Sequence, residues 1–218
     1  MDVLTPRSLD DALRLKSDHP DAVPIQGGTD LMVALNFDRT RPQTILNLNE
    51  VAELRGWARD NGFLRLGSGL TYTEAMGLAD ELRALAEASR TVGSPQIRNR
   101  GTIGGNLGTA SPAGDALPPL LIERAEIEVA SIRGSRHVPI AEFLVGVKRN
   151  ALEPDELIVA TRLSPSRQRQ TFMKVGPRNA MVIAVCSLAV CVDADLGELR
   201  GAFGSAGPIA AGCAPRRR

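Results

Sequence analysis

Two glycine-rich stretches carry the residue types best suited to holding a ligand. One reads GGTDLM over residues 27–32, and the other reads GTIGGNLGTASPAGD over residues 101–115. Adjacent glycines free backbone N–H groups and remove side-chain bulk, so that a phosphate or diphosphate can approach the main chain. Asn106 adds an amide that both donates and accepts, and Asp115 can accept from ribose hydroxyls. These groups together suit a nucleotide diphosphate, whereas either stretch alone also fits an ordinary structural turn.

The first stretch follows no standard nucleotide motif. No Gly-Lys-Ser/Thr follows Gly28, which excludes a P-loop, and the G-x-G-x-x-G spacing of dinucleotide-binding folds is missing. Asp30 would repel a phosphate unless it caps the following helix or turns aside.

The remaining reactive side chains do not form a catalytic or metal-binding set. The chain has three cysteines (Cys186, Cys191 and Cys213) and two histidines (His19 and His137) among its 218 residues. We find no Ser/His/Asp or Cys/His arrangement and expect no metal site on this chain. Cys186 and Cys191 lie in one strand-like run at an odd spacing, which directs them to opposite faces. An odd number of cysteines without framework spacing suits a reducing compartment.

The composition narrows the possible partners. A net charge of +1 argues against nucleic acid. No apolar run approaches the ~20 residues of a membrane span, and the first residues lack the apolar centre of a signal peptide. We therefore expect a cytoplasmic protein that has no membrane span and no nucleic-acid partner.

The elements around the first glycine stretch follow the order helix, strand, turn, helix and strand. Ser8 can cap a helix in SLDDALRLKSD, and Thr29 or Asp30 can cap the helix after the glycines. The short runs AVPIQ (22–26) and TILNLN (44–49) are typical of buried strands. This alternation predicts a small α/β unit with parallel strands.

Strands predominate in the rest of the chain. Helical patterns are interrupted near Gly77, and a further helix is predicted to begin at Asp115, with Pro118 and Pro119 in its first turn. A short helix is predicted at 141–146. Strand patterns cover the ranges 63–72, 126–132, 136–140, 156–163, 171–175, 181–195 and 198–206.

The glycine stretches also carry a resemblance to a known family. The segments PIQGGTDLM, VGSPQIRNRGTIGGNLGTASPAGDALPPLL and FMKVGPRNAMVIAVCSLAV resemble the FAD-binding subunit of molybdenum hydroxylases, such as xanthine, carbon monoxide and nicotinate dehydrogenases. The resemblance implies an α+β fold with a FAD-binding domain over residues 1–167, as in vanillyl-alcohol-oxidase-like flavoproteins. That domain would combine a small parallel α/β unit (about 1–55) with a larger antiparallel sheet and helices (56–167). A partial small antiparallel domain would follow over residues 168–218.

The resemblance also implies the cofactor-binding residues. The first loop would cradle the FAD pyrophosphate with Pro24, Ile25, Gln26, Gly27, Gly28, Thr29, Asp30 and Leu31. The second motif would wrap the other side of the cofactor with Thr102, Ile103, Gly104, Gly105 and Asn106, with Ser111 nearby and Asp115 at the ribose end. Ile158 would lie against the isoalloxazine and Lys174 near its polar edge, while Val92 stands where some relatives place an aromatic over the flavin.

The reaction implied by the resemblance is electron transfer. Substrate is oxidised at a molybdenum cofactor on a large partner subunit, and electrons pass through two 2Fe–2S clusters on a small partner to the flavin. FAD then passes them to NAD, oxygen, a quinone or another acceptor. This chain would bind and orient a non-covalent FAD, with no catalytic side chain and no cluster of its own.

The C-terminal end departs from the family pattern. Likeness stops after AFGSAGP, and the tail GSAGPIAAGCAPRRR has no amphipathic helix to cover the preceding strands. We therefore expect a truncated C-terminal domain with an exposed apolar sheet face. Two alternatives stay open: a truncated subunit that binds partners or FAD without turnover, and a free-standing flavin oxidoreductase.

Overall fold

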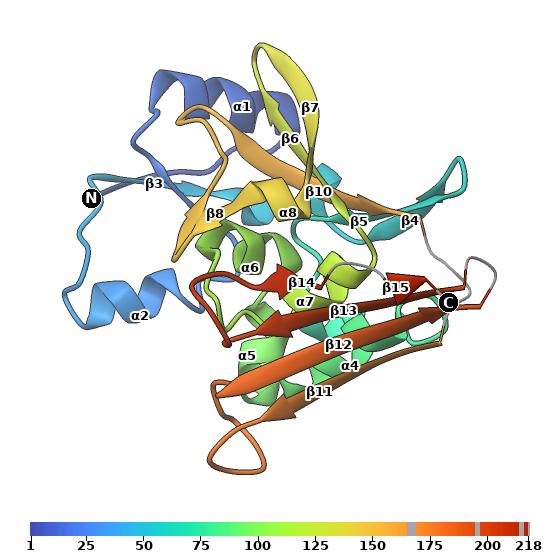
Figure 1. The fold of residues 1–218 in the computed structure, drawn as a ribbon. Coiled ribbons are helices and arrows are strands. Elements are labelled where there is room, and N and C mark those ends of the chain that lie inside the picture. Colours follow the sequence, from blue (N-terminus) through green and yellow to red (C-terminus); the bar gives the residue numbers. More distant parts are fainter. Residues whose placement is uncertain (165–168, 195–196, 214–215, 218) are drawn as a thin grey trace.

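The first part of the chain forms a small parallel sheet. The computed structural model describes residues 1–164, 169–194, 197–213 and 216–217 (Figure 1). The sheet has the order β1-β3-β2, with bounds β1 (Asp2–Leu4), β2 (Val23–Ile25) and β3 (Thr44–Asn47), and both pairings are parallel. The predicted parallel unit is thus confirmed, and β1 is an additional strand that the sequence pattern did not indicate.

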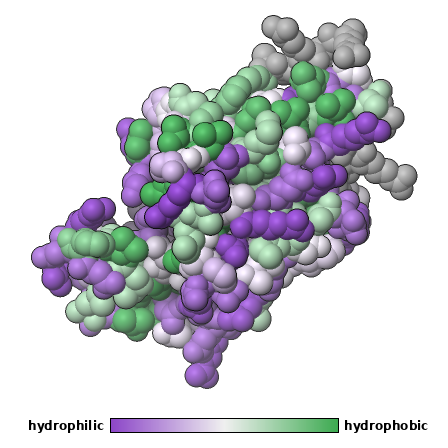
Figure 2. Space-filling model, turned by 90° about the horizontal axis from the view of Figure 1, so that it is seen from below, coloured by the Kyte–Doolittle hydropathy of each residue, from purple (hydrophilic) through white to green (hydrophobic). Residues whose placement is uncertain are grey.

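Two helices accompany this sheet. Helix α1 (Leu9–Asp18) begins where the Ser8 hydroxyl accepts the Asp11 N–H at 3.2 Å, and it buries Ala12 and Leu13. Helix α2 (Leu31–Asn36) buries no side chain and forms a separate lobe, at left in Figure 1. Seen from below in Figure 2, this lobe is set off from the body by an indentation. In the segment that joins β2 to α2, residues 26–29 are half-buried and Asp30 is exposed.

A larger antiparallel sheet forms the centre of the molecule. Its strands, in the order β4-β5-β10-β6-β7, are β4 (Trp57–Asp60), β5 (Phe63–Gly67), β10 (Leu157–Leu163), β6 (Glu126–Ser131) and β7 (Gly134–Pro139). Alternate residues such as Leu64, Leu66, Ile127 and Val129 point into one apolar core, because successive side chains of a strand face opposite sides. This sheet confirms the second part of the fold that the resemblance implies.

Helices and a short hairpin surround the core of this sheet. They are α3 (Tyr72–Ala75), α4 (Arg83–Thr91), α5 (Pro95–Arg100), α6 (Ile103–Thr109), α7 (Leu117–Ile122), α8 (Ile140–Phe143), β8 (Leu144–Gly146) and β9 (Arg149–Asn150), with single 3₁₀ turns η1 (Leu48–Glu50) and η2 (Ala52–Leu54). The interruption near Gly77 separates α3 from α4, as predicted. The second glycine stretch, in contrast, contains a helix, α6, rather than only a turn.

The helix predicted to begin at Asp115 begins later. Helix α7 starts at Leu117 with Ala116 as its N-cap, and no side chain caps it. Pro118 and Pro119 lie in its first turn, where the missing N–H groups cost nothing. Asp115 is therefore not a helix cap.

A third sheet closes the chain. It has the order β11-β12-β13-β14, with β15 also paired to β13, and its strands are β11 (Arg169–Val175), β12 (Cys186–Asp193), β13 (Glu198–Gly204), β14 (Ala211–Gly212) and β15 (Arg216–Arg217). The strand predicted over residues 181–195 begins only at Cys186 and ends at Asp193; Ala194 lies in a turn, and Asp195 is outside the described residues. One face, with Phe172 and Ala202, packs on α4 and α7, while Met173 and Val175 on the other face are 57% and 64% exposed.

The described ranges contain no helix long and apolar enough to cross a lipid bilayer.

Candidate functional site

The two glycine stretches meet in the folded chain. A side chain at Gly27 would place its Cβ 2.2 Å from the Arg100 carbonyl oxygen, so Gly27 is needed for this close approach. The Arg100 guanidinium donates to the Gln26 carbonyl oxygen and to Asn49 Oδ1, each at 3.4 Å. The turn after β2 thus lies directly against the residues that lead into α6.

The first turn presents free backbone donors. Among the residues that the structure describes, none accepts a hydrogen bond from the backbone N–H groups of Gly27, Gly28, Thr29, Asp30 or Leu31. Gly28 has a φ of +73°, a conformation that a residue without a Cβ adopts at little cost. Consecutive free N–H groups leading into a helix form a concavity that suits an anion.

The Asp30 side chain does not cap α2. It occupies the N-cap position, but its side chain accepts no capping hydrogen bond, and it is exposed. Its Oδ1 lies 4.0 Å from Lys148 Nζ in the β8–β9 hairpin. Pro24 and Ile25 lie in β2, and the Ile25 side chain packs beside Gly28. These two residues therefore support the turn from the strand that precedes it.

The second stretch is built differently. The N–H groups at the start of α6 are already used: Ile103 donates to the Leu70 carbonyl at 2.9 Å, and Gly104 donates to the Ser68 carbonyl at 2.8 Å. Gly105 donates to its own N-cap, Thr102 Oγ1, at 2.9 Å. The start of α6 therefore has no spare donors of the kind that the first turn has.

Helix α6 instead offers a bare side. Gly105 and Gly108 are both exposed and lie three residues apart, which places them on the same face of the helix. A Cβ at Gly108 would meet only Ile158 Cδ1, at 3.7 Å. Gly104 is buried, and a Cβ there would lie 2.6 Å from the Ser68 carbonyl oxygen. A flat group can thus approach the backbone of α6 above the buried Ile158.

Asn106 and Ser111 act within the protein. Asn106 Oδ1 accepts the Ala116 N–H at 3.3 Å, and the Asn106 amide packs on Gly114, where a Cβ would come within 2.6 Å of its Nδ2. Ser111 Oγ accepts the Ala113 N–H at 3.3 Å. Both side chains hold the turn that carries Asp115.

Asp115 and Lys174 form a buried ion pair that joins the central domain to the third sheet. Lys174 Nζ donates to Asp115 Oδ2 at 2.6 Å and to the Thr91 carbonyl at 3.1 Å, and the two side chains are 6% and 8% exposed. Within the described part of the chain, Asp115 Oδ1 is buried without a partner. Burial raises the pKa of Asp115, and the hydrogen bond and charge of Lys174 oppose that shift.

Tyr72 lies beside this pair. Burial raises the pKa of its phenol, and the negative charge of Asp115 raises it further. Tyr72 therefore stays neutral at physiological pH.

A cavity of about 230 Å³ opens next to the pair. Its walls combine the polar residues of the Asp115 turn with apolar ones, and they are Tyr72, Val92, Gly93, Asn106, Ala113, Gly114, Asp115, Met181, Val182 and Ile183. Asp115 Oδ1 is the buried unpartnered acceptor among these residues. A ligand that donates a hydrogen bond from an otherwise apolar ring would satisfy it.

The structure brings most of the residues implied by the resemblance into one region. Gly27 adjoins Arg100, Ile158 lies under Gly108, and Lys174 contacts Asp115. Sequence reasoning did not identify Arg100 or Tyr72, or the segment from Met181 to Ile183. Arg100 stands in the motif IRNRG and could have been found there, whereas Tyr72 and Met181 reach the site only through tertiary packing. In the described residues no group of His, Cys, Asp and Glu side chains could hold a metal ion.

Three comparisons relate the chain to known proteins. Residues 1–164 match the family described as "FAD binding domain in molybdopterin dehydrogenase". The chain is 36% identical over 216 residues to the putative xanthine dehydrogenase FAD-binding subunit of Escherichia coli K12, covering 94% of this chain and 74% of that protein. It is 32% identical over 200 residues to the nicotinate dehydrogenase FAD-subunit of Eubacterium barkeri, covering 87% and 68%.

Solved structures show the same fold. The carbon monoxide dehydrogenase of Hydrogenophaga pseudoflava superposes with a TM-score of 0.92 at 25% identity, over 97% of this chain and 77% of that chain. Quinoline 2-oxidoreductase from Pseudomonas putida gives a TM-score of 0.91, also at 25% identity, over 97% of this chain and 76% of that chain.

Proposed function

Because the chain belongs to the family of FAD-binding domains in molybdopterin dehydrogenases, we propose that it is the FAD-binding electron-transfer subunit of a molybdenum hydroxylase. Its partners would be an iron–sulfur small subunit and a large subunit with the molybdenum cofactor, in the cytoplasm. The final acceptor would be NAD, oxygen or another carrier. We also propose the division into a FAD-binding domain over residues 1–167, with parts at about 1–55 and 56–167, and a second domain from residue 168.

The observation that carries this proposal is the row of free donors from Gly27 to Leu31. A diphosphate needs several hydrogen-bond donors and little steric bulk, and this turn offers both. The donors at the start of α6 are used within the protein, so we assign the diphosphate to the first turn alone. Gln26 and Arg100 fix that turn in place.

The bare side of α6 and the cavity beside it suit the rest of the cofactor. Gly105 and Gly108 allow close approach, and Ile158 provides an apolar floor under Gly108. The N–H groups of Ile103 and Gly104 hold α6 against the segment after β5, and Thr102 Oγ1 caps the helix, so these groups are not free for the ligand. Bound FAD would supply one- and two-electron redox chemistry, and the protein would hold and orient it.

The ion pair limits how FAD can lie. The resemblance implies that Asp115 is at the ribose end and Lys174 at the polar edge of the ring, yet these side chains are 2.6 Å apart. Both must therefore face the same part of the cofactor. We assign both to the polar edge of the ring, because Asp115 Oδ1 can accept from a ring N–H and the remaining Lys174 proton can be donated to a ring carbonyl.

Reconstitution with the partner subunits tests this function. The purified chain, loaded with FAD, is mixed with its iron–sulfur partner in the reduced state, and the absorbance of oxidised flavin is followed. We expect the flavin absorbance to fall only when the partner is present. A chain that binds FAD but is never reduced by that partner would contradict the electron-transfer role and favour a subunit without turnover.

A further inference from the structure

Helix α6 is a poor helix by its own sequence. Three of its seven residues are glycines, Gly104, Gly105 and Gly108, and each costs about 1 kcal/mol relative to alanine in a helix interior. Gly104 is required by the contact with Ser68, and Gly105 and Gly108 form the bare side. The position of α6 is therefore set by its surroundings: Ile103 and Leu107 are buried in the central core, and hydrogen bonds hold both ends of the helix.

The start of α6 is fixed by the central sheet. The Ile103 and Gly104 N–H groups donate to carbonyls of the segment after β5, and Thr102 caps the helix. These bonds hold the first turn of the helix but do not reach its end.

The end of α6 is fixed by the β8–β9 hairpin. Asn150 Nδ2 donates to the Gly108 carbonyl at 2.8 Å, and the Lys148 N–H donates to the Ala110 carbonyl at 3.1 Å. Both acceptors belong to the group of carbonyls that a helix end leaves without an internal partner. Of these two donors, only Asn150 uses a side chain, so only this bond can be removed by substitution without altering the backbone.

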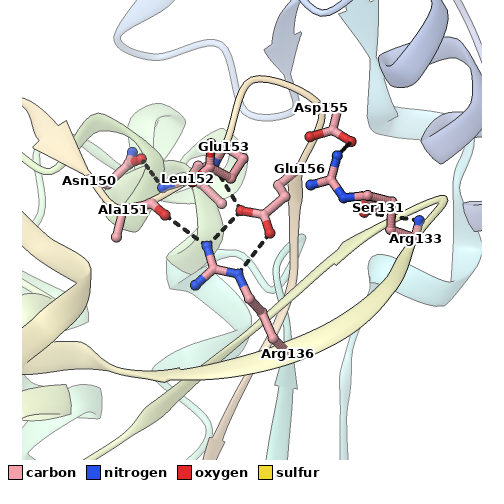
Figure 3. Close-up of polar contacts among 9 residues, drawn as sticks. All are labelled: Ser131, Arg133, Arg136, Asn150, Ala151, Leu152, Glu153, Asp155 and Glu156. Carbon is pink, nitrogen blue, oxygen red and sulfur yellow. Dashed lines mark hydrogen bonds and ion pairs between the residues drawn. The ribbon is translucent and has the colours of Figure 1, made fainter.

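The Asn150 amide is itself held in one orientation. Its Oδ1 accepts the Leu152 N–H at 3.1 Å (Figure 3), and its Nδ2 is left to donate to Gly108. Arg136 donates to Glu156 through two bonds of 2.7 Å and to the Ala151 carbonyl at 2.8 Å. The Glu153 N–H adds a bond of 2.8 Å to Glu156. The loop that presents Asn150 is thus tied to β7 by a largely buried carboxylate.

We propose that Asn150 is a positioning residue for the cofactor: through the Gly108 carbonyl it holds the bare side of α6 at the distance that the ligand requires. This inference rests on the proposed function. Asn150 acts through α6, because its amide donates to the Gly108 carbonyl and Asn150 is not among the residues that line the cavity.

Two substitutions test the bond and a third serves as control. Asn150→Ala removes the whole amide, while Asn150→Asp keeps the acceptor for Leu152 and removes the donor to Gly108. Arg133→Ala removes the ion pair between Arg133 and Asp155. Asp155 lies in the loop that follows Asn150, and the ion pair has no link to Gly108. All three purified chains are titrated with FAD at a temperature where each is folded, and amide hydrogen exchange of residues 103–110 is measured without FAD.

We expect both Asn150 variants to bind FAD about tenfold more weakly, the equivalent of one lost hydrogen bond. Exchange over 103–110 should be faster in them, and the visible circular dichroism of bound flavin should change. Arg133→Ala should match the unsubstituted chain in all three measurements. Unchanged FAD affinity and exchange in Asn150→Ala, or an equal loss in Arg133→Ala, would overturn this inference alone. An unsubstituted chain that takes up no FAD would overturn the proposed function and this inference with it.

Discussion

Single residues in this site divide into those that shape the protein and those that leave room for a ligand. Gly27 and Gly104 are glycines because a Cβ would collide with backbone oxygens, of Arg100 and Ser68 respectively. Gly108 has no such neighbour, and a Cβ there would meet only Ile158 at an ordinary contact distance. Gly108 therefore leaves room for a ligand that the packing of the protein itself does not need.

Substituting Gly108 by alanine separates stability from binding. Gly108→Ala should raise the free energy of unfolding by about 0.5–1 kcal/mol, because alanine is the better helix former and the new methyl fits. The same methyl would project from the bare side of α6 and weaken FAD binding. Urea denaturation and FAD titration measure the two effects.

Gly104→Ala provides the contrast. Its Cβ would lie 2.5 Å from the Ser68 Cβ, so we expect a loss of about 1–3 kcal/mol in unfolding free energy. Full FAD affinity in Gly108→Ala would show that the ligand does not lie on α6.

The Asp115–Lys174 pair can be examined with a double-mutant cycle. Asp115→Asn and Lys174→Met each leave the other member buried without a counter-charge, and each should lower the unfolding free energy by about 3–5 kcal/mol. The double variant should recover most of that loss, since replacing a buried pair as a whole is close to neutral.

FAD binding should not recover in the double variant, because the cofactor contacts are gone. Denaturation and flavin titration of the four chains provide the test. A double variant that binds FAD like the unsubstituted chain would make the pair a purely structural feature.

The sequence pointed to residues of the candidate site more readily than to what each of them does there. The pairing of adjacent glycines and the motif as a whole pointed to Gly27, Gly28 and Gly105, and whether they bind the cofactor stays a prediction. The sequence did not show that carbonyls of Leu70 and Ser68 take up the donors of α6, because those partners lie more than thirty residues away along the chain. The contact of Asp115 with Lys174 was hidden for the same reason.

At the scale of elements, α6 is placed by its neighbours rather than by its own propensity. Its glycines lower helix propensity, which is why the sequence pattern indicated only a turn at 101–115. The β8–β9 hairpin and the loop that follows it supply the missing support through Asn150. The strand after Met181 begins late because residues 176–185 form a loop at the cavity instead.

The loop that holds Asn150 should be sensitive to acid. Hydrogen bonds from Arg136 keep the pKa of Glu156 below its usual value of 4.5, although burial opposes this. A carboxylate with a lowered pKa contributes stability above its unfolded pKa and loses it as the pH falls through the folded value. Glu156→Gln should therefore cost about 1–2 kcal/mol at pH 7, since Arg136 is partly exposed.

The difference between the two chains should shrink below about pH 4.5. Denaturation curves from pH 7 to pH 3 measure it, and Glu142→Gln, at an exposed position, should stay within about 0.5 kcal/mol of the unsubstituted chain throughout. A difference that is the same at pH 7 and pH 3 would exclude ionised Glu156 as its source.

In the described residues three larger sheets stand beside the two-stranded β8–β9 hairpin, and each of the three contributes to the candidate site. The parallel sheet supplies the first turn, the central sheet supports α6, and the third sheet brings Lys174 to Asp115 (Figure 1). Periodicity in the sequence predicted the parallel unit and most strands. The antiparallel order of the central sheet followed only from the family resemblance, because strand pairing between distant segments such as β5 and β10 leaves no local pattern.

The third sheet keeps one apolar face open to solvent, and Met173, Val175, Leu199 and Phe203 are each at least 40% exposed. The relatives are longer: this chain spans about three quarters of the Escherichia coli protein and of the carbon monoxide dehydrogenase chain. The exposed apolar face that the sequence predicts for this sheet is present in the described residues.

The most direct test of the account is to observe the backbone amides of the first turn while FAD is added. Amide resonances of Gly27, Gly28, Thr29, Asp30 and Leu31 are followed by NMR in the purified chain at increasing FAD concentration. We predict that all five shift together and saturate with the affinity measured from flavin absorbance, while amides of helix α1 stay in place. Saturating FAD that leaves these five amides unchanged would contradict the claim that this turn holds the cofactor.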